Sequence, residues 1–256
     1  MKSKLGELIA WELQDNWSFP VLEIIAVITT LQVMSFTTIQ HDTTILVNVV
    51  VKPFFSNMSF VIIISATVVF GKSFADSIEK RKLVVLLSYP VSRTQVFIAK
   101  YLTNLLTLFL IFGSALLAQG ISLFLFDGFF QPVLWAFTFL YLLLAVFFTS
   151  SLMTLISLTV KQLGLSTLIF LIYMFGIEYG LPINLTNPLT YLSLDIGPWA
   201  SVQYSITWYT NWLNIGISST GWPPQNCFLT AISYTLVGGV ALFLASLVFI
   251  NRIDLD

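Results

Sequence analysis

Long uncharged blocks separated by short charged segments dominate the chain. Nineteen residues without charge lie between Lys52 and Lys72, 26 lie between Lys100 and Asp127, and 33 lie between Asp127 and Lys161. An apolar stretch of about 18 residues or more is long enough for a helix to cross a hydrocarbon core about 30 Å thick. The pattern therefore predicts membrane-spanning segments.

The lengths of the apolar blocks predict six such segments. Inside hydrocarbon the backbone must pair its own polar groups, which allows only helices or closed barrels. The blocks are apolar on every side and lack the alternation of barrel strands, so we expect an all-α, polytopic membrane helix bundle. It forms one transmembrane domain over residues 1–256, with spans at about 19–39, 53–71, 100–126, 132–159, 163–181 and 228–250.

Two further segments have patterns of their own. Residues 1–18 place apolar side chains at helical spacing and put Glu12 and the other charges elsewhere around the helix, which predicts an amphipathic interfacial helix. Residues 182–225 contain four of the seven tryptophans and Asp195 as their only charge. This segment predicts short extracytoplasmic helices or a re-entrant piece at the membrane interface, and an aromatic packing cap is the alternative.

Composition and charge agree with a membrane protein and orient it. The chain is 57% hydrophobic and 9% charged, against about 25% charged residues in soluble domains. Lysine and arginine accumulate in cytoplasmic loops. With both termini in the cytoplasm, ten of the eleven lysines and arginines lie inside and only Lys52 lies outside. We therefore expect a multi-pass protein of the plasma (cell) membrane, without a cleavable signal peptide.

The polar residues offer little for catalysis. The only cysteine, Cys227, excludes an intrachain disulfide, and the only histidine, His41, reads as a solvated residue. An intramembrane enzyme would need converging polar groups, but the spans contain only Glu23 and Glu178, near opposite membrane faces. We expect no catalytic, cofactor-binding or metal-binding residues in this chain. Asn184 begins a glycosylation-type sequon on the outer side.

The cytoplasmic loop over residues 72–99 carries the most information. A charged run precedes the apolar run 83–87, and leaving that run in water costs about 1.5 kcal/mol or more per large side chain. Something should therefore cover it. Ser92 and Gln95 match a capping box that starts the next helix in the cytosol. The charged face of the loop suits either a protein partner or anionic lipid.

At this loop the sequence resembles a known family. Glu79, the apolar run, residues 88–93 (Ser-Tyr-Pro-Val-Ser-Arg) and Lys100 resemble the pattern of permease subunits of type-2 ABC exporters, which is Glu, then Leu-Leu-Ser-x-Pro-(Ile/Val)-Ser-Arg, then Lys. The chain departs from the pattern at residues 80–82 (Lys-Arg-Lys), where the family more usually has a small or Gly-containing stretch.

The resemblance implies a coupling helix that docks on a separate ATP-binding cassette ATPase subunit, which would hold ATP and Mg. The docking residues would be Asp76, Glu79, Lys80, Arg81, Lys82, Leu83, Leu86, Leu87, Pro90, Ser92 and Arg93. Two permeases, either copies or paralogues, would meet largely through the first and fifth spans, which suits the GxxxG spacing of Gly176 and Gly180. No nucleic-acid partner is expected.

Two functions from the same architecture remain open. The first is a transport subunit, which the resemblance implies to be the permease of an exporter. The second is a membrane anchor that assembles other proteins without its own transport path. The 23 phenylalanines suit a lipophilic or amphipathic cargo, but lipid-facing surface explains the same composition.

Overall fold

The computed structural model describes residues 4–17, 23, 27, 51–87, 91–127, 132–180, 192–194, 196–212, 229 and 231–252. Within these ranges the chain is all-helical apart from turns, with no strand. Almost all of the expected first span lies outside the described residues, as do His41, Asn184 and Cys227. The all-α class is confirmed for the described part of the chain.

Among the described residues, five helical segments are long and apolar enough to cross a membrane. They are Phe54–Glu79, Arg93–Ser122, Pro132–Val160, Leu163–Gly180 and Ser233–Arg252. Each corresponds to one of the expected spans, and most of the ends agree closely. The largest differences are at the end of the second span, which continues to Glu79 and not only to residue 71, and at the start of the third span, which begins at Arg93 and not at residue 100. A capping box described below starts the third helix earlier.

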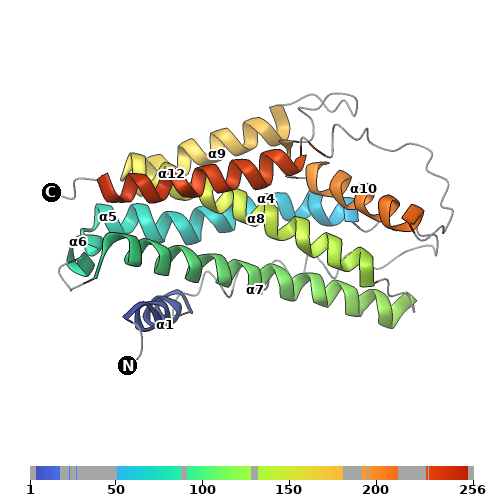
Figure 1. The fold of residues 1–256 in the computed structure, drawn as a ribbon, viewed down its shortest axis with the longest axis horizontal. Helices are drawn as coiled ribbons and strands as arrows, with labels where there is room; N and C mark the ends of the chain where they lie inside the picture. The colour runs from blue at the N-terminus through green and yellow to red at the C-terminus, as the bar shows by residue number, and fades with distance from the viewer. Residues whose placement is uncertain are drawn as a thin grey trace.

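The elements follow one another along the chain as shown in Figure 1. They are α1 (Lys4–Trp17), α4 (Lys52–Gly71), the π-helix η2 (Lys72–Asp76), α5 (Ser77–Glu79), α6 (Lys82–Leu87), α7 (Arg93–Asp127), α8 (Pro132–Val160), α9 (Leu163–Gly180), α10 (Ile196–Trp212), the π-helix η4 (Ser233–Gly238) and α12 (Gly239–Arg252). Because no residue separates α4, η2 and α5, these three form one continuous helix.

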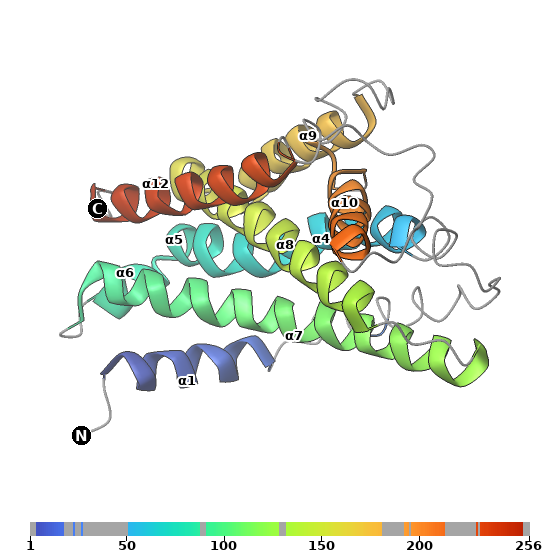
Figure 2. The ribbon, with the colours of Figure 1, turned by 45° about the vertical axis from the view of Figure 1, so that its right-hand side comes forward.

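The long helices run in alternating directions between two ends of the bundle. We call the end that holds α5, α6, the start of α7 and the end of α12 the basic end, because Lys80, Arg81, Lys82, Arg93 and Arg252 lie there (Figures 1 and 2). Helix α7 has 35 residues and is about 52 Å long, well over the thickness of a hydrocarbon core. Helix α7 is therefore longer than a single crossing requires.

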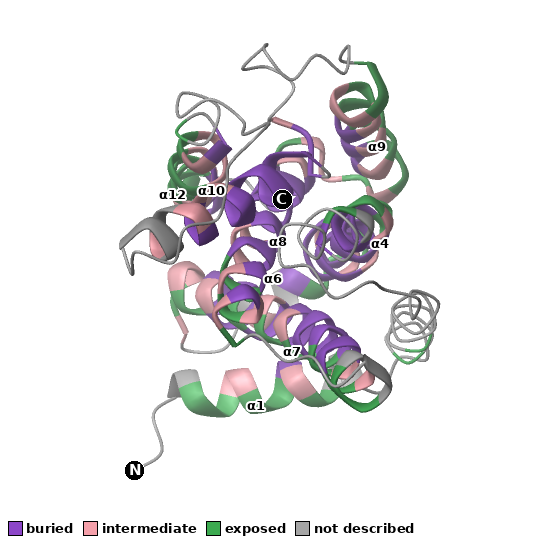
Figure 3. Cartoon of the chain, turned by 90° about the vertical axis from the view of Figure 1, so that its right-hand side faces the viewer, coloured by how far each residue is buried: buried purple, intermediate pink, exposed green. Residues whose placement is uncertain are grey.

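Helix α8 lies at the centre of the bundle and contacts α4, α7, α9, α10 and α12. Figure 3 shows it buried among its neighbours. Its C-terminal half carries a row of fully buried small hydroxyl residues, namely Thr149, Ser150, Ser151, Thr154 and Ser157. In hydrocarbon, small residues permit close helix contacts and hydroxyls bond within or between helices. Thr154 Oγ1 accordingly donates to the Ser150 carbonyl at 2.7 Å.

Aromatic side chains join α4, η2, α7 and α12 near the basic end. The rings of Phe70 and Tyr101 meet edge to face at 5.4 Å, and Tyr101 lies 4.7 Å from Phe243. The Tyr101 hydroxyl is paired with Ser151 Oγ at 2.7 Å, so this buried polar group has a partner. The cluster fixes the start of α7 against the end of α4, and this is where the charged loop begins.

Helix α1 lies along α7 (Figure 2). The sequence placed Glu12 away from the apolar face of this helix, and that expectation is wrong. Glu12 is 3% exposed and its Oε1 lies 2.7 Å from Lys100 Nζ. The physical reason is that Glu12 follows Leu8 by four residues and Ile9 by three, which puts it on the same helix face as these apolar residues.

Candidate functional site at the basic end of the bundle

The charged loop predicted from the sequence has a defined shape that we call the elbow. It consists of α5, a turn at Lys80 and Arg81, and α6. The turn closes with two backbone hydrogen bonds, from Lys80 N–H to the Asp76 carbonyl at 2.9 Å and from Arg81 N–H to the Ile78 carbonyl at 3.0 Å. The helix thus ends at Glu79, and the chain turns there.

Arg81 has a left-handed backbone, with φ of 55°. Side chains disfavour this conformation by about 1–2 kcal/mol, whereas glycine adopts it freely. Arg81 therefore lies at a position where the backbone itself favours glycine. The elbow maintains the turn with an arginine and so presents an additional cation there.

The Glu79 carboxylate faces the chain's own fifth predicted span. Its Oε2 accepts a hydrogen bond of 2.9 Å from the backbone N–H of Leu163, the first residue of α9. The first N–H groups of a helix have no partner within the helix and carry partial positive charge, which suits a carboxylate. Glu79 thus links the elbow to α9.

Asp76 and Lys80 form an ion pair one helical turn apart, with Lys80 Nζ 2.7 Å from Asp76 Oδ1. Asp76 is buried and Lys80 is exposed. The hydrogen bond that Lys80 donates to Asp76, together with the negative charge of Asp76, raises the pKa of Lys80 above 10.5, so Lys80 remains protonated at neutral pH. The ion pair stabilises the fold while Lys80 is protonated. This contribution is lost as the pH rises through the raised pKa of Lys80.

The apolar run of the loop is covered in part by the bundle itself. Leu83 is 3% exposed and lines a small gap with Phe74, Phe97 and Ile250 at the ends of η2, α7 and α12. Leu86 is half-buried against the same core. Leu83 is therefore a residue that anchors α6, and its side chain does not form part of the exposed surface.

The predicted capping box is confirmed at the start of α7. Gln95 N–H donates to Ser92 Oγ at 3.2 Å, and Ser92 N–H donates to Gln95 Oε1 at 3.1 Å. Close by, Thr94 Oγ1 donates to Asn251 Oδ1 at 3.2 Å and joins the start of α7 to the end of α12. The elbow is therefore held on one side by α9 and on the other by α7 and α12.

Most of the proposed docking residues that are exposed carry a positive charge. Lys80, Arg81, Lys82, Glu79 and Ser92 are exposed, and Arg93 is half-buried. Pro90 and the side chain of Leu87 lie outside the described residues. With Glu79 bonded to Leu163 and Asp76 paired with Lys80, the remaining charges present a positive surface suited to an acidic partner.

The opposite end of the bundle is closed by α10. Glu178 accepts a hydrogen bond at Oε2 from Leu194 N–H at 2.9 Å, just before α10. Ser193 Oγ caps the helix by accepting from Ile196 N–H at 3.0 Å. Lys52, the cation expected outside, lies over the Trp199 ring with its Nζ 5.1 Å from the ring centroid. The sequence did not reveal this contact.

The remaining predicted residues are on the surface. A side chain added at Gly176 or Gly180 would meet nothing within 4 Å, and both glycines are exposed on α9. Glu23 is also exposed. Within the described ranges, no three His, Cys, Asp or Glu side chains come together in a way that could hold a metal ion.

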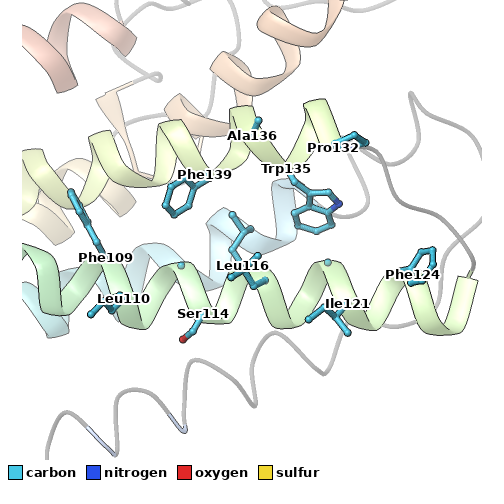
Figure 4. A pocket seen from close by; sticks show the side chains of 13 residues that line it. Phe109, Leu110, Ser114, Leu116, Ile121, Phe124, Pro132, Trp135, Ala136 and Phe139 are labelled. Carbon is cyan, nitrogen blue, oxygen red and sulfur yellow. The ribbon is translucent and has the colours of Figure 1, made fainter.

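An apolar cavity of about 890 Å³ lies between α7 and α8, away from the basic end (Figure 4). Trp135 and Phe139 of α8 face α7, where Gly113 and Gly120 leave room for their rings. The other lining residues are Phe109, Leu110, Ser114, Leu116, Leu117, Ile121, Phe124, Pro132 and Ala136. A lining with so few polar groups suits hydrocarbon.

Among the described residues, the elbow thus presents an exposed charged surface and the cavity an apolar space. The chain matches no protein-family model, and no curated protein is similar enough in sequence to count as a relative.

Proposed function

We propose that this chain is the transmembrane permease subunit of an ATP-binding cassette exporter, driven by a separate ATPase subunit that docks on the elbow. The observation that carries the proposal is the elbow itself. It is bonded to α9 through Glu79, packed on α7 and α12 through Leu83, and it displays the three consecutive exposed cations Lys80, Arg81 and Lys82. A separate ATPase subunit can move the helices of this chain only through a segment that is attached to them.

The proposed topology has six spans, with α1 on the inner membrane surface and the basic end in the cytoplasm. The charge distribution supports it, because ten of the eleven lysines and arginines then lie inside. In this arrangement α10 lies on the outer side of a plasma-membrane protein. ATP and Mg belong to the partner, and this chain holds no cofactor.

Partner recovery and transport test the proposal together. The chain, purified in mild detergent from its own host, should bring down an ATP-hydrolysing subunit, and inverted vesicles should then take up cargo only when ATP is present. Reversing the charges at Lys80, Arg81 and Lys82 should lower recovery of this subunit at least about tenfold. Arg252→Glu is the matched control, since Arg252 is exposed at the same end but lies outside the elbow.

Two results would point elsewhere. If charge reversal leaves ATPase recovery intact but abolishes binding to anionic vesicles, the basic surface anchors the protein on lipid. If the ATPase is recovered but no cargo ever moves with ATP, the chain is an assembly subunit without a transport path. The elbow serves both of these alternatives, so transport is the measurement that separates them.

The cavity between α7 and α8 supports a lipophilic or amphipathic cargo. Its volume of about 890 Å³ and its aromatic walls suit an acyl chain, and α7 and α8 are both proposed spans. Gly120→Leu would place a side chain against Trp135, whose ring atoms already lie 3.6 Å from an added Cβ. ATP-driven uptake of a fluorescent lipid should fall in this variant while ATPase recovery is kept; unchanged uptake would remove the cavity from the transport path.

A further inference from the structure

Helix α9 buries few of its side chains, and it is hydrogen-bonded to other elements at both of its ends. Only Ser166, Phe170 and Met174 are buried among its 18 residues, whereas α8 has fifteen buried residues among 29. Its first N–H bonds to Glu79, and Glu178 in its last turn bonds to Leu194 N–H. The position of a helix with so little buried surface depends strongly on such end contacts.

The inner end of α9 meets the helix that carries Glu79. An added Cβ on Gly71, the last residue of α4, would lie 3.1 Å from Leu163 Cδ1, so the first turn of α9 packs directly on the end of α4. Only Lys161 and Gln162 separate α8 from α9, and Lys161 has a positive φ of 61°. The joint between α8 and α9 is therefore sharp, and the start of α9 is placed by its neighbours.

Glu79 occupies the point where these parts converge. It is the last residue of the continuous helix α4–η2–α5, and the elbow turn begins directly after it. A displacement of the elbow must either carry Leu163 along through the hydrogen bond or break that bond. Breaking it leaves the first N–H of α9 without its carboxylate partner, so the two movements are energetically linked.

We propose that Glu79 is a positioning residue that carries movement of the elbow to α9, and that its carboxylate does not contact the ATPase. This inference rests on the proposed function for the source of the movement. The structural part, the dependence of the start of α9 on the Glu79 carboxylate, stands on the contact with Leu163 alone.

Amide hydrogen exchange of the full chain tests the structural part. In Glu79→Ala the Leu163 amide should exchange about fivefold faster, because a bond with a net worth of about 1 kcal/mol is lost. Glu79→Gln keeps an oxygen acceptor and should remain close to the unmodified chain. Lys82→Ala, a change of an exposed residue in the next turn, is the matched control. Equal exchange in Glu79→Ala and the unmodified chain would overturn the proposal.

Transmission is tested in the complex with the ATPase. A bimane label on Leu165→Cys, in a Cys227→Ser background, reports the surroundings of α9, because Leu165 is exposed near its start. ATP should change the label's fluorescence in the unmodified complex. In Glu79→Ala this change should be lost although the ATPase still co-purifies and hydrolyses ATP, and Glu79→Gln should restore it. A merely structural defect would not separate hydrolysis from the α9 response in this way.

The failures are distinguishable. If Glu79→Ala retains the full fluorescence change, or if both Glu79 variants lose the ATPase, Glu79 does not transmit and the proposal is overturned, while the proposed function survives. If the unmodified chain recovers no ATPase, the proposed function and the transmission step both fail. Hydrogen exchange then decides separately whether Glu79 positions the start of α9.

Discussion

Lys100 Nζ lies 2.7 Å from Glu12 Oε1, and both side chains are almost completely buried between α1 and α7. Removing two charges from water is costly, and their attraction compensates only when the geometry is good. Such a pair stabilises little compared with apolar residues, but loss of one partner leaves an uncompensated buried charge. The pair therefore specifies where α1 lies on α7.

Lys100→Met should release α1 from α7. The substitution leaves the Glu12 carboxylate buried without its cation, at a cost of about 3–5 kcal/mol, and α1 can avoid that cost by moving into water. Hydrogen exchange over residues 4–17 should rise to nearly the rate of an unfolded peptide. The bundle itself should keep its melting temperature within a few degrees.

Replacing both partners is the control for this prediction. Glu12→Leu combined with Lys100→Met removes both charges and should restore most of the protection of α1, because apolar residues of similar size pack in their place. The double variant could instead lose as much protection of α1 from hydrogen exchange as Lys100→Met does. That result would show that the pair contributes more than the balance of its two charges.

The residue patterns along the chain predict the helices well and their lateral contacts poorly. The uncharged blocks fix the five described spans because hydrocarbon allows few alternatives. Local signals such as the Ser92 and Gln95 capping box are also readable, since both partners lie within four residues. Contacts such as Glu79 with Leu163, 84 residues apart, depend on how the helices pack.

Glu12 in the fold and Leu83 in the candidate site show the same limit. Helical spacing alone could have placed Glu12 with Leu8 and Ile9, but its charge argued for water until its partner on α7 was known. Leu83 reads as part of an apolar run that needs cover, and only the fold shows that Phe74 and Ile250 supply part of that cover. Burial of a charge or a loop residue is decided by its partner.

Ser92→Ala should weaken the start of α7. The variant removes the hydroxyl that accepts from Gln95 N–H, and loss of such a cap costs about 1 kcal/mol. Exchange of the Gln95 amide should increase several-fold, with little change at Thr103 in the buried middle of the helix. Ser92→Thr keeps the cap and serves as the control; equal exchange in both variants would contradict the assignment of the cap.

Arg81→Gly should stabilise the elbow. Arginine at a φ of 55° carries a strain of about 1 kcal/mol that glycine relieves, although glycine's larger freedom in the unfolded chain offsets part of the gain. The melting temperature in detergent should rise slightly or stay constant. Arg81→Val should lower it, because a β-branched residue tolerates this backbone least. A lower melting temperature for Arg81→Gly than for Arg81→Val would contradict the left-handed turn at this residue.

Gly176→Ile combined with Gly180→Ile should leave folding intact and abolish self-association. Both glycines are exposed and an added Cβ would meet nothing within 4 Å, so we expect larger side chains to fit within the fold. If α9 packs against a second permease, the same side chains prevent the close helix approach that a GxxxG pair allows. Cross-linking in membranes and light scattering in detergent should then show monomer in place of dimer.

Gly239→Ala provides the contrasting variant for this experiment. An added Cβ there would lie 2.8 Å from the Phe147 ring and 3.4 Å from the Phe148 backbone, so α12 could not keep its distance from α8. This single methyl group should cost about 1–3 kcal/mol of stability without selecting against the dimer. A melting temperature that falls more for the α9 double variant than for Gly239→Ala would mean that the glycine face of α9 packs within the chain and is not a surface for a partner.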